Sequence, residues 1–108
     1  QRVSRVYFPG LADCDPLGLL GRQMRGPGAM LAIRLRDGYA HATQVTNRVR
    51  LFTHAVSLGG VDSLIQHPGA LTHRPVASHA RPDPALVRLS IGLEGSDDLQ
   101  ADLDQALG

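Results

Sequence analysis

Two stripes of apolar residues at helical spacing are separated along this chain by short segments that alternate like β-strands. The first stripe predicts a helix over about residues 39–51. It consists of Ala42, Val45, Val49 and Phe52. The second predicts a C-terminal helix capped by residues 96–98, because Asp97 and Asp98 suit the positive end of its dipole. This stripe consists of Leu99, Leu103 and Leu107.

One more helix is expected over residues 15–24, where Asp15 is a suitable N-cap and Pro16 suits the first helical position. The extended segments are the remaining apolar runs, and they cover residues 3–7, 30–35, 52–57, 63–66 and 87–91. Strands alternating with helices in so short a chain predict an α/β (α+β) two-layer sandwich. In it, helices cover one face of a small, largely antiparallel sheet, and the other face needs a partner surface.

The composition argues against several classes of partner. The formal net charge is +1 and the 11 basic residues are all scattered arginines, so neither nucleic acid nor a membrane surface is expected to bind the chain. No segment approaches the roughly 18 apolar residues of a membrane span. Cys14 is the single cysteine, which excludes an internal disulfide and is typical of a cytoplasmic protein. Without an initiator methionine, the chain is expected to begin inside a longer protein.

Five histidines raise the question of a metal site, but none belongs to a His-Glu-x-x-His pattern. The single cysteine has no second cysteine at metal-binding spacing, so a zinc site is not favoured. The histidines are His41, His54, His67, His73 and His79. Ser57, His73 and Asp62 offer the residue types of a catalytic triad, but the Gly-x-Ser-x-Gly turn that exposes such a serine is missing.

The most specific pattern lies in residues 54–73, HAVSLGGVDSLIQHPGALTH, and in residues 86–94, LVRLSIGLE. Three shorter motifs precede them in order, Pro9-Gly10-Leu11, Arg22-Gln23-Met24 and Gly28-Ala29-Met30. Over nearly its whole length the chain therefore resembles the C-terminal domain of the pyridoxal-phosphate enzymes of cysteine and methionine metabolism. That family includes cystathionine γ-synthase, cystathionine γ- and β-lyases and methionine γ-lyase, and the chain is most similar to the last.

The resemblance implies that residues 1–108 form a C-terminal substrate-binding domain with the architecture found in fold-type I pyridoxal-phosphate enzymes. It implies pyridoxal 5'-phosphate as the cofactor of the intact enzyme, held covalently by a lysine. This chain contains no lysine, so we expect that residue to lie in an N-terminal domain of the same protein, outside the chain. The intact enzyme is expected to be a homotetramer, and this chain alone is expected to be inactive.

Arg88 and Ser57 are the main site residues that the resemblance implies. In the family, the arginine of the R-L-S-x-G-L-E segment binds the α-carboxylate of the substrate, and a guanidinium suits this task because its planar fork pairs bidentately with a carboxylate. Ser57 begins the Ser-Leu-Gly-Gly motif and is expected beside the carboxylate and the lysine amine, as a catalytic and a substrate-binding residue. Without the motifs, these residue types would fit an exposed strand arginine and a turn serine.

Val56 bears on the choice of substrate. Cystathionine-using members commonly have Glu at this position, whereas methionine γ-lyases resemble this chain in having Val. An apolar side chain suits a thioether, so the resemblance implies γ-elimination of methionine or a related amino acid to a 2-oxo acid, ammonia and a thiol. Leu58, Gln66 and Thr72 also match positions near the family's substrate pocket.

Two alternatives stay open beside the methionine-like reading. One is a cystathionine γ-synthase or γ-lyase in transsulfuration, in which Val56 is only a packing residue. The other is a stand-alone binding domain without catalysis, which the missing lysine favours. The chain departs from the family at residues 14–17, where His-Pro-x-His is usual, and at Asp62, where Glu is usual. It departs again in the Pro-rich residues 74–85, which are shorter than typical and are expected to form a surface connection.

Overall fold

The computed structural model describes residues 2–71 and 81–108. One layer is a five-stranded sheet in the order β1-β2-β5-β4-β3. Its strands are β1 (Val3–Tyr7), β2 (Met30–Leu35), β3 (Thr53–His54), β4 (Leu64–Gln66) and β5 (Leu86–Ser90). Three neighbouring pairs are antiparallel, and β3 runs parallel to β4. The expected small, largely antiparallel sheet is therefore confirmed, with one parallel pair at the β3 edge.

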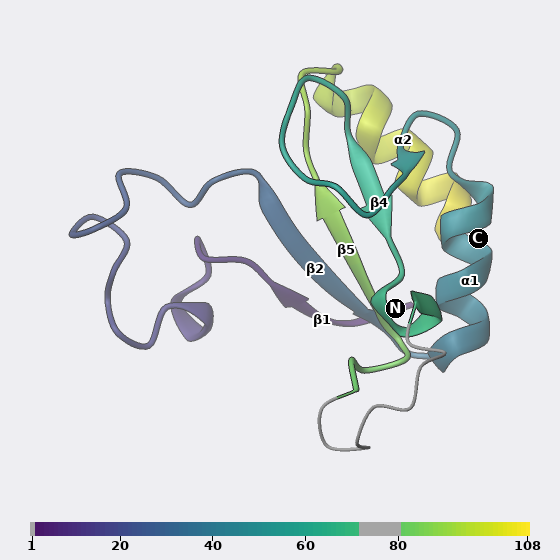
Figure 1. Ribbon diagram of the computed structural model, residues 1–108, viewed down its shortest axis with the longest axis horizontal. Coiled ribbons are helices and arrows are strands. Elements are labelled where there is room, and N and C mark those ends of the chain that lie inside the picture. The colour runs from purple at the N-terminus through teal and green to yellow at the C-terminus, as the bar shows by residue number, and fades with distance from the viewer. Residues whose placement is uncertain (1, 72–80) are drawn as a thin grey trace.

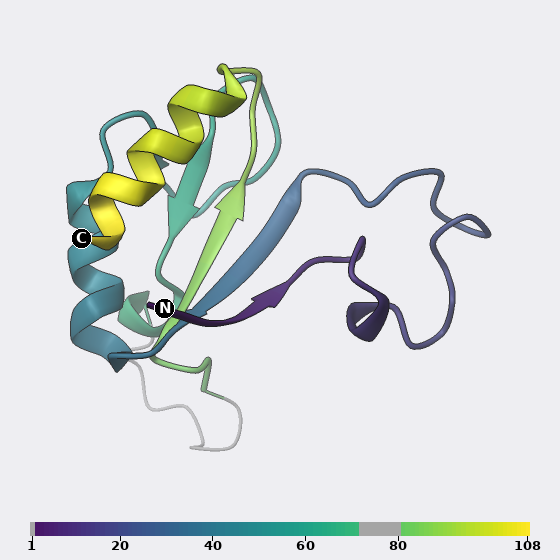
Figure 2. The ribbon, with the colours of Figure 1, turned by 180° about the vertical axis from the view of Figure 1, so that it is seen from behind.

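The other layer consists of α1 (Gly38–Arg48) and α2 (Ser96–Leu107). Figures 1 and 2 show both helices on the same side of the sheet, so the expected two-layer sandwich is confirmed. Two short 3₁₀ turns, η1 (Ala12–Cys14) and η2 (Pro68–Leu71), complete the described elements. In the part of the chain that the structure describes, no helix has the length and apolar character required to cross a membrane.

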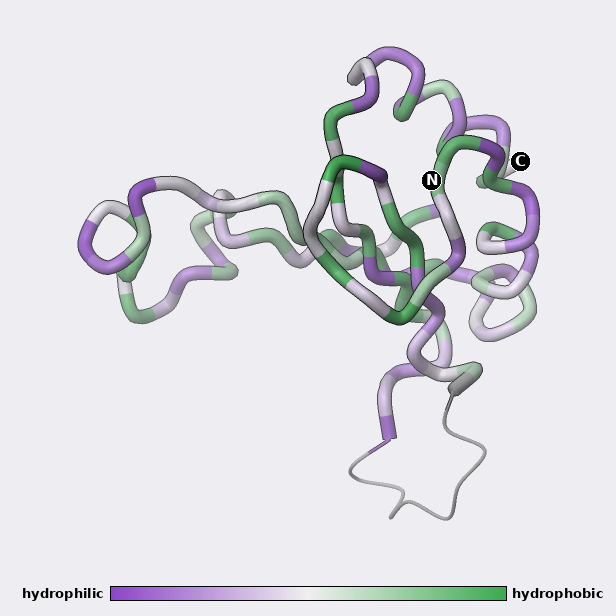
Figure 3. The backbone as a smooth tube through the Cα atoms, turned by 45° about the horizontal axis from the view of Figure 1, so that its top comes forward, coloured by the Kyte–Doolittle hydropathy of each residue, from purple (hydrophilic) through white to green (hydrophobic). Residues whose placement is uncertain are grey.

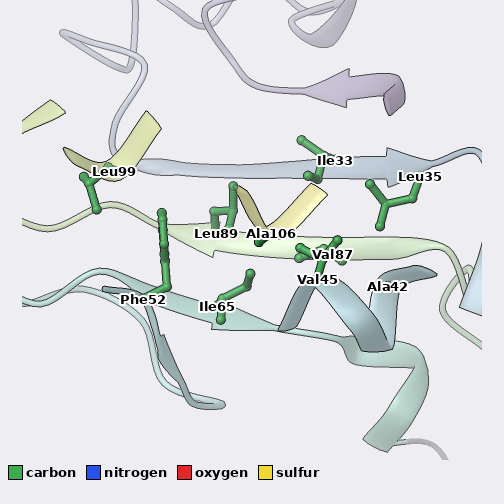
Figure 4. Packing of buried hydrophobic residues seen from close by; sticks show 10 residues of the cluster. All are labelled: Ile33, Leu35, Ala42, Val45, Phe52, Ile65, Val87, Leu89, Leu99 and Ala106. Carbon is green, nitrogen blue, oxygen red and sulfur yellow. The ribbon is translucent and has the colours of Figure 1, made fainter. Parts of the chain in front are cut away.

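The core fills the space between the sheet and the two helices. Alternate residues of β2, β4 and β5 point toward the helices, and the apolar faces of α1 and α2 meet them (Figure 4). Removing a Val, Leu, Ile or Phe side chain from water stabilises a fold by roughly 1.5–3 kcal/mol. The buried cluster comprises Ile33, Leu35, Ala42, Val45, Phe52, Ile65, Val87, Leu89, Leu99 and Ala106.

Helix α1 ends at Arg48, three residues before the boundary that its apolar stripe predicts. The reason is Asp102 of α2, whose carboxylate accepts hydrogen bonds from the backbone N–H groups of Arg50, Leu51 and Phe52 at 2.7–3.2 Å. Those N–H groups are therefore not available to the carbonyl groups of α1. Phe52 still enters the core, but from the connection that follows the helix.

The helix expected over residues 15–24 is wrong. Residues 8–29 instead form an arm of turns that projects from the packed layers (Figure 1), with hydrophobic stretches along it (Figure 3). Gly18 and Gly21 have φ values of 64° and 88°, outside the helical region, and none of the described core residues comes from the arm. A ten-residue helix with two glycines and no packed face is not stable. Asp15 still caps N–H groups, those of Leu19 and Leu20, but in a turn.

Other boundaries shift by a few residues. Helix α2 is N-capped by Gly95 without a side-chain cap, so the capping role expected of residues 96–98 is wrong, although Asp97 and Asp98 do lie in the first turn. Strand β3 covers only two residues of the expected extended segment 52–57, because the chain then turns away from the sheet. Of the expected connection 74–85, only residues 81–85 lie within the described part of the chain.

Candidate functional site

Arg88 lies in the middle of the sheet, on the face that the helices leave open. Its neighbours in β5, Val87 and Leu89, are buried against the helices, so the alternation of the strand directs Arg88 to the opposite face. The strand register pairs Arg88 with Ala32 of β2 and with Gln66 of β4. These three residues form a row across the centre of the open face.

The guanidinium of Arg88 binds the backbone through one of its nitrogens, Nη2. Its Nη2 donates hydrogen bonds to the carbonyl oxygens of Val56, at 3.1 Å, and Ser57, at 2.7 Å. Its Nε is buried and has no hydrogen-bond partner among the described residues. An unpaired buried donor on a charged group is costly, so this Nε is suited to an added acceptor such as a carboxylate oxygen.

Gln66 presents a second unpaired polar atom beside Arg88. Its Oε1 is buried and has no partner within the described chain. Because the two residues are register partners on adjacent antiparallel strands, their side chains lie on the same face of the sheet. A ligand that carries both an acceptor and a donor would satisfy both groups. Sequence reasoning had named both residues as substrate-binding, and the structure brings them together.

The loop that carries Ser57 connects β3 to β4, and residues 55–63 are called the site loop below. Val56 is 67% exposed and Leu58 is 60% exposed. Ser57 is exposed as well, and it is its carbonyl oxygen that binds Arg88. Large apolar side chains with this exposure are typical of a surface that another surface covers. The site loop thus exposes an apolar surface next to the backbone that binds Arg88.

Gly59 and Gly60 form the turn of the site loop. Their φ values are 77° and 98°, in the region that only glycine adopts readily. The N–H of Gly59 donates to Oγ of Ser90 in β5 at 2.9 Å. Since this N–H already has a partner, the pair of glycines serves a tight turn rather than a phosphate cradle, as the sequence indicates.

Ser63 and Glu94 form a contact at the end of the site loop that the sequence did not predict. The Glu94 carboxylate accepts hydrogen bonds from the N–H of Ser63, at 2.9 Å, and from its hydroxyl, at 2.7 Å. The bond from the Ser63 N–H, and then that from the hydroxyl, holds the pKa of Glu94 below its usual range. The signal for Glu94 was the repeated spacing in residues 88–94, where Arg, Ser, Gly and Glu occupy alternate positions.

Thr72 lies outside the described residues, as do His73 and His79. Its expected place near the substrate, and the Ser57, His73 and Asp62 arrangement, therefore stay untested. Within residues 2–71 and 81–108, no three His, Cys, Asp or Glu side chains lie close enough to hold a metal ion. The single thiol of Cys14 is in the projecting arm, on η1.

The residues present do not fit covalent attachment of pyridoxal phosphate. The sequence contains no lysine, and the Gly59 N–H that could have faced a phosphate is bound to Ser90. Among the described residues of the strands, the unpaired buried side-chain atoms are Arg88 Nε and Gln66 Oε1, which suit the polar groups of an amino acid. A lysine that holds the cofactor must therefore lie outside this chain.

Comparisons with known proteins cover almost the whole chain. A family model described as Cys/Met metabolism PLP-dependent enzyme matches residues 1–108. The L-methionine gamma-lyase of Brevibacterium sandarakinum is 55% identical over 105 residues, which are 97% of this chain and 27% of that protein. The cystathionine gamma-synthase of Mycobacterium bovis is 47% identical over 107 residues, 98% of this chain and 28% of that protein.

A solved structure shares the fold as well. The crystal structure of cystathionine gamma synthase from Xanthomonas oryzae pv. oryzae, in complex with aminoacrylate and cysteine, superimposes with a TM-score of 0.85 at 42% identity. It covers 98% of this chain, which spans 28% of that one. The chain therefore spans just over a quarter of the length of the relatives it matches. Because the family model matches all 108 residues, this chain belongs to the family of PLP-dependent enzymes of cysteine and methionine metabolism.

Proposed function

We propose that this chain is the C-terminal substrate-binding domain of a longer PLP-dependent enzyme that cleaves the carbon–sulfur bond of methionine or a related thioether amino acid. The observation that carries the proposal is the guanidinium of Arg88, whose Nη2 binds the site loop while its buried Nε has no partner among the described residues. The relatives' greater length supports an N-terminal domain as the part that completes the site and holds the cofactor lysine.

In this proposal Arg88 binds the α-carboxylate of the amino acid. The backbone carbonyls of Val56 and Ser57 both accept from Nη2 and so fix the direction of the guanidinium. Hydrogen bonds from the guanidinium to the carboxylate would fix the orientation of the α-carbon relative to the cofactor. Ser57 lies next to this position, and its exposed hydroxyl would contact the carboxylate or the lysine amine.

The overall reaction would convert L-methionine and water into 2-oxobutanoate, ammonia and methanethiol. The cofactor, when bound, supplies the electron sink for this chemistry, and it lies outside this chain. The chain contributes binding and orientation. Val56 and Leu58, both exposed into the open site, would give the apolar wall against which a methyl thioether packs.

A second candidate is cystathionine γ-synthase or γ-lyase activity in transsulfuration. It is supported by the 47% identity to the Mycobacterium bovis cystathionine gamma-synthase. Cystathionine carries a second ammonium and carboxylate group, which an apolar Val56 would not compensate. The Val56 side chain therefore favours methionine over cystathionine as the substrate.

The test is a comparison of substrates in the full-length enzyme that contains this chain. We expect a higher kcat/KM for thiol release from L-methionine than for cleavage of L-cystathionine. Val56→Glu should reverse the preference, with Leu51→Glu, at an exposed apolar position outside the site loop, as the matched control. Preference for cystathionine in the unmodified enzyme would support the second candidate.

The state of the intact protein is also a proposal. A homotetramer that contains this chain fits the family, and a single cysteine fits a cytoplasmic location. Mass spectrometry of the denatured protein after borohydride reduction tests whether this chain is part of a longer enzyme. We expect a longer polypeptide that carries a cofactor adduct on lysine. If the gene encoded a polypeptide of only these 108 residues, the stand-alone binding domain would be favoured instead.

A further inference from the structure

The site loop is held to β5 and the residues after it by a ladder of contacts at every second residue. Arg88 Nη2 forms the first rung, on the carbonyl oxygens of Val56 and Ser57. Ser90 forms the second, where its Oγ accepts the N–H of Gly59 at 2.9 Å. Alternate residues of an extended chain point to the same side, so the spacing of these rungs follows from the strand geometry.

Gly92 is the third rung. Its N–H donates to Oγ of Ser63 at 2.8 Å, and the N–H of Leu93 donates to the carbonyl oxygen of Val61 at 2.8 Å. A side chain at position 92 would collide with the backbone of Val61 and Asp62, so the two segments approach as closely as a glycine allows.

Glu94 is the fourth rung and the only one with a negative charge. Both of its carboxylate oxygens accept from Ser63, one from the N–H and one from the hydroxyl, which in turn accepts from Gly92. Ser63 is fully buried and is the last residue before β4. Charge-assisted hydrogen bonds of this kind are about twice as strong as neutral ones. We therefore expect the contact between Glu94 and Ser63 to be the strongest of the four.

The ladder matters because hydrophobic burial does not hold the site loop. Val56, Leu58 and Val61 are 60–67% exposed, and Gly59 and Gly60 add conformational freedom in the unfolded chain. Its two ends are held by bonds from the N–H groups of Thr53 and Ala55 to the carbonyl oxygens of Ser63 and Ile65. Between these ends, polar contacts to residues 88–94 define the position of its backbone. The same backbone supplies the two carbonyl oxygens that aim Arg88.

We propose that Glu94 and Ser63 are positioning residues that hold the site loop on β5 and thereby aim the guanidinium of Arg88 at the carboxylate of the amino acid. The inference rests on the proposed function of Arg88, but its first step, the fixing of the loop, does not. From the sequence, Glu94 is only one position of the R-L-S-x-G-L-E motif. Its contact with Ser63 assigns it the role of fixing the loop.

The first experiment measures amide hydrogen exchange in the full-length enzyme without substrate. Glu94→Gln and Ser63→Ala should each speed exchange of the site loop, including the Gly59 amide, by about tenfold or more. The double variant should be no faster than the faster single variant, because each change breaks the same contact. Asp102→Asn is the matched control, since it removes a carboxylate that holds residues 50–52, and it should leave residues 57–61 unchanged.

The second experiment measures binding of L-norleucine, which has a methylene in place of the sulfur of methionine and no thiol to release. We expect Glu94→Gln and Ser63→Ala to weaken its binding about tenfold and to raise the KM for methionine more than they lower kcat. Simple loss of folded enzyme would lower kcat at unchanged KM, as expected for Asp102→Asn.

The two proposals fail separately. Unchanged exchange of the site loop, or unchanged norleucine binding, in Glu94→Gln and Ser63→Ala would overturn the positioning role. Absence of norleucine binding to the unmodified enzyme would instead contradict the proposed function, while the exchange data would still decide whether Glu94 and Ser63 fix the loop.

Discussion

Arg88 shows how one side chain can belong to the fold and to the site together. Two of its contacts, to the carbonyl oxygens of Val56 and Ser57, attach the site loop to the sheet. Its Nε is buried and has no hydrogen-bond partner among the described residues, which is uncommon for a charged group. In the proposed function this donor meets the carboxylate of the amino acid, which is a strong acceptor for a guanidinium.

Arg88→Lys in the full-length enzyme should raise the KM for its amino acid substrate by roughly 10- to 100-fold. A lysine keeps the charge but cannot bind the loop and a carboxylate in fixed directions, and a bond to a charged group contributes about 1.5–3 kcal/mol. Steady-state kinetics would measure the change. Arg36→Lys, at an exposed position one residue beyond β2, is the control and should leave KM unaltered. An equal KM in both variants would contradict carboxylate binding by Arg88.

Gly92→Ala should destabilise the chain by about 1–3 kcal/mol, the usual cost of forcing atoms into a packed position. Its new Cβ would lie 2.6 Å from the carbonyl carbon of Asp62 and closer still to the carbonyl oxygen of Val61. Thermal unfolding would measure the loss. Gly26→Ala is the matched control, because nothing lies within 4 Å of its added Cβ, and it should be neutral or slightly stabilising. Equal effects of the two changes would contradict the close approach.

Helices α1 and α2 show how one side chain sets the length of a neighbouring element. The apolar stripe would carry α1 to about residue 51, but the carboxylate of Asp102 takes the N–H groups of Arg50, Leu51 and Phe52. The chain then turns, so that Phe52 packs in the core and β3 can begin at Thr53. Gln105 supports the same turn by donating to the carbonyl oxygen of Arg48.

Asp102→Asn should therefore lower the free energy of unfolding by about 1–3 kcal/mol, since an amide oxygen replaces a buried carboxylate that accepts several hydrogen bonds. The effect would be measured by urea denaturation. Asp104→Asn, on an exposed position of the same helix, is the control and should change stability by less than about 0.5 kcal/mol. A loss no larger than that of the control would show that the turn does not depend on the carboxylate.

The molecule as a whole is a two-layer domain whose sheet is covered by helices on one face and uncovered on the other. The helices cover one side of the sheet (Figures 1 and 2). Exposed apolar side chains gather on the site loop and the arm, among them Val56, Leu58 and Leu17. The relatives are almost four times as long as this chain, so the open face and the arm are where we expect the remainder of the enzyme to pack.

The stability of the whole chain should fall on acidification. The pKa of Asp83 is lowered by the N–H of Ala85 and by Arg34, and that of Glu94 by Ser63. For Asp102, burial is the largest single influence and raises the pKa, but the bonds from Arg50, Leu51 and Gln105 together outweigh it and lower the pKa. These carboxylates thus stabilise the fold fully above their unfolded pKa of about 4, and the stabilisation is lost as pH falls through their folded pKa values.

Urea denaturation between pH 7 and pH 3 would measure this dependence. We expect a nearly constant free energy of unfolding near neutral pH and a decline below about pH 4 to 5. Asp102→Asn should show a shallower decline than the unmodified chain, because one of the three carboxylates has been removed. An equal slope in both would contradict a lowered pKa for Asp102.

Much of the architecture could be predicted from local patterns. Residues 30–35 alternate with the period of a strand, and Leu99, Leu103 and Leu107 repeat with the period of a helix. Each period fits only one type of element, and both elements formed as expected. The helix over residues 15–24 failed because its signals were local while its stability needed a packed face, which the arm does not have. The motifs also led to Arg88, Val56 and Ser57, which the structure brings within hydrogen-bonding distance, although their roles in catalysis stay predictions.

The sequence alone determined the family, the two-layer architecture and the absence of a lysine. These follow from motifs, periodicity and composition, which are properties of the linear chain. The partners of individual polar groups were not, because they join residues far apart in sequence. Asp102 binds N–H groups about fifty positions away, and Glu94 binds Ser63 across 31 positions. Such pairings depend on which strands become neighbours, and hydrogen bonds are too short in range to form before packing has brought their groups together.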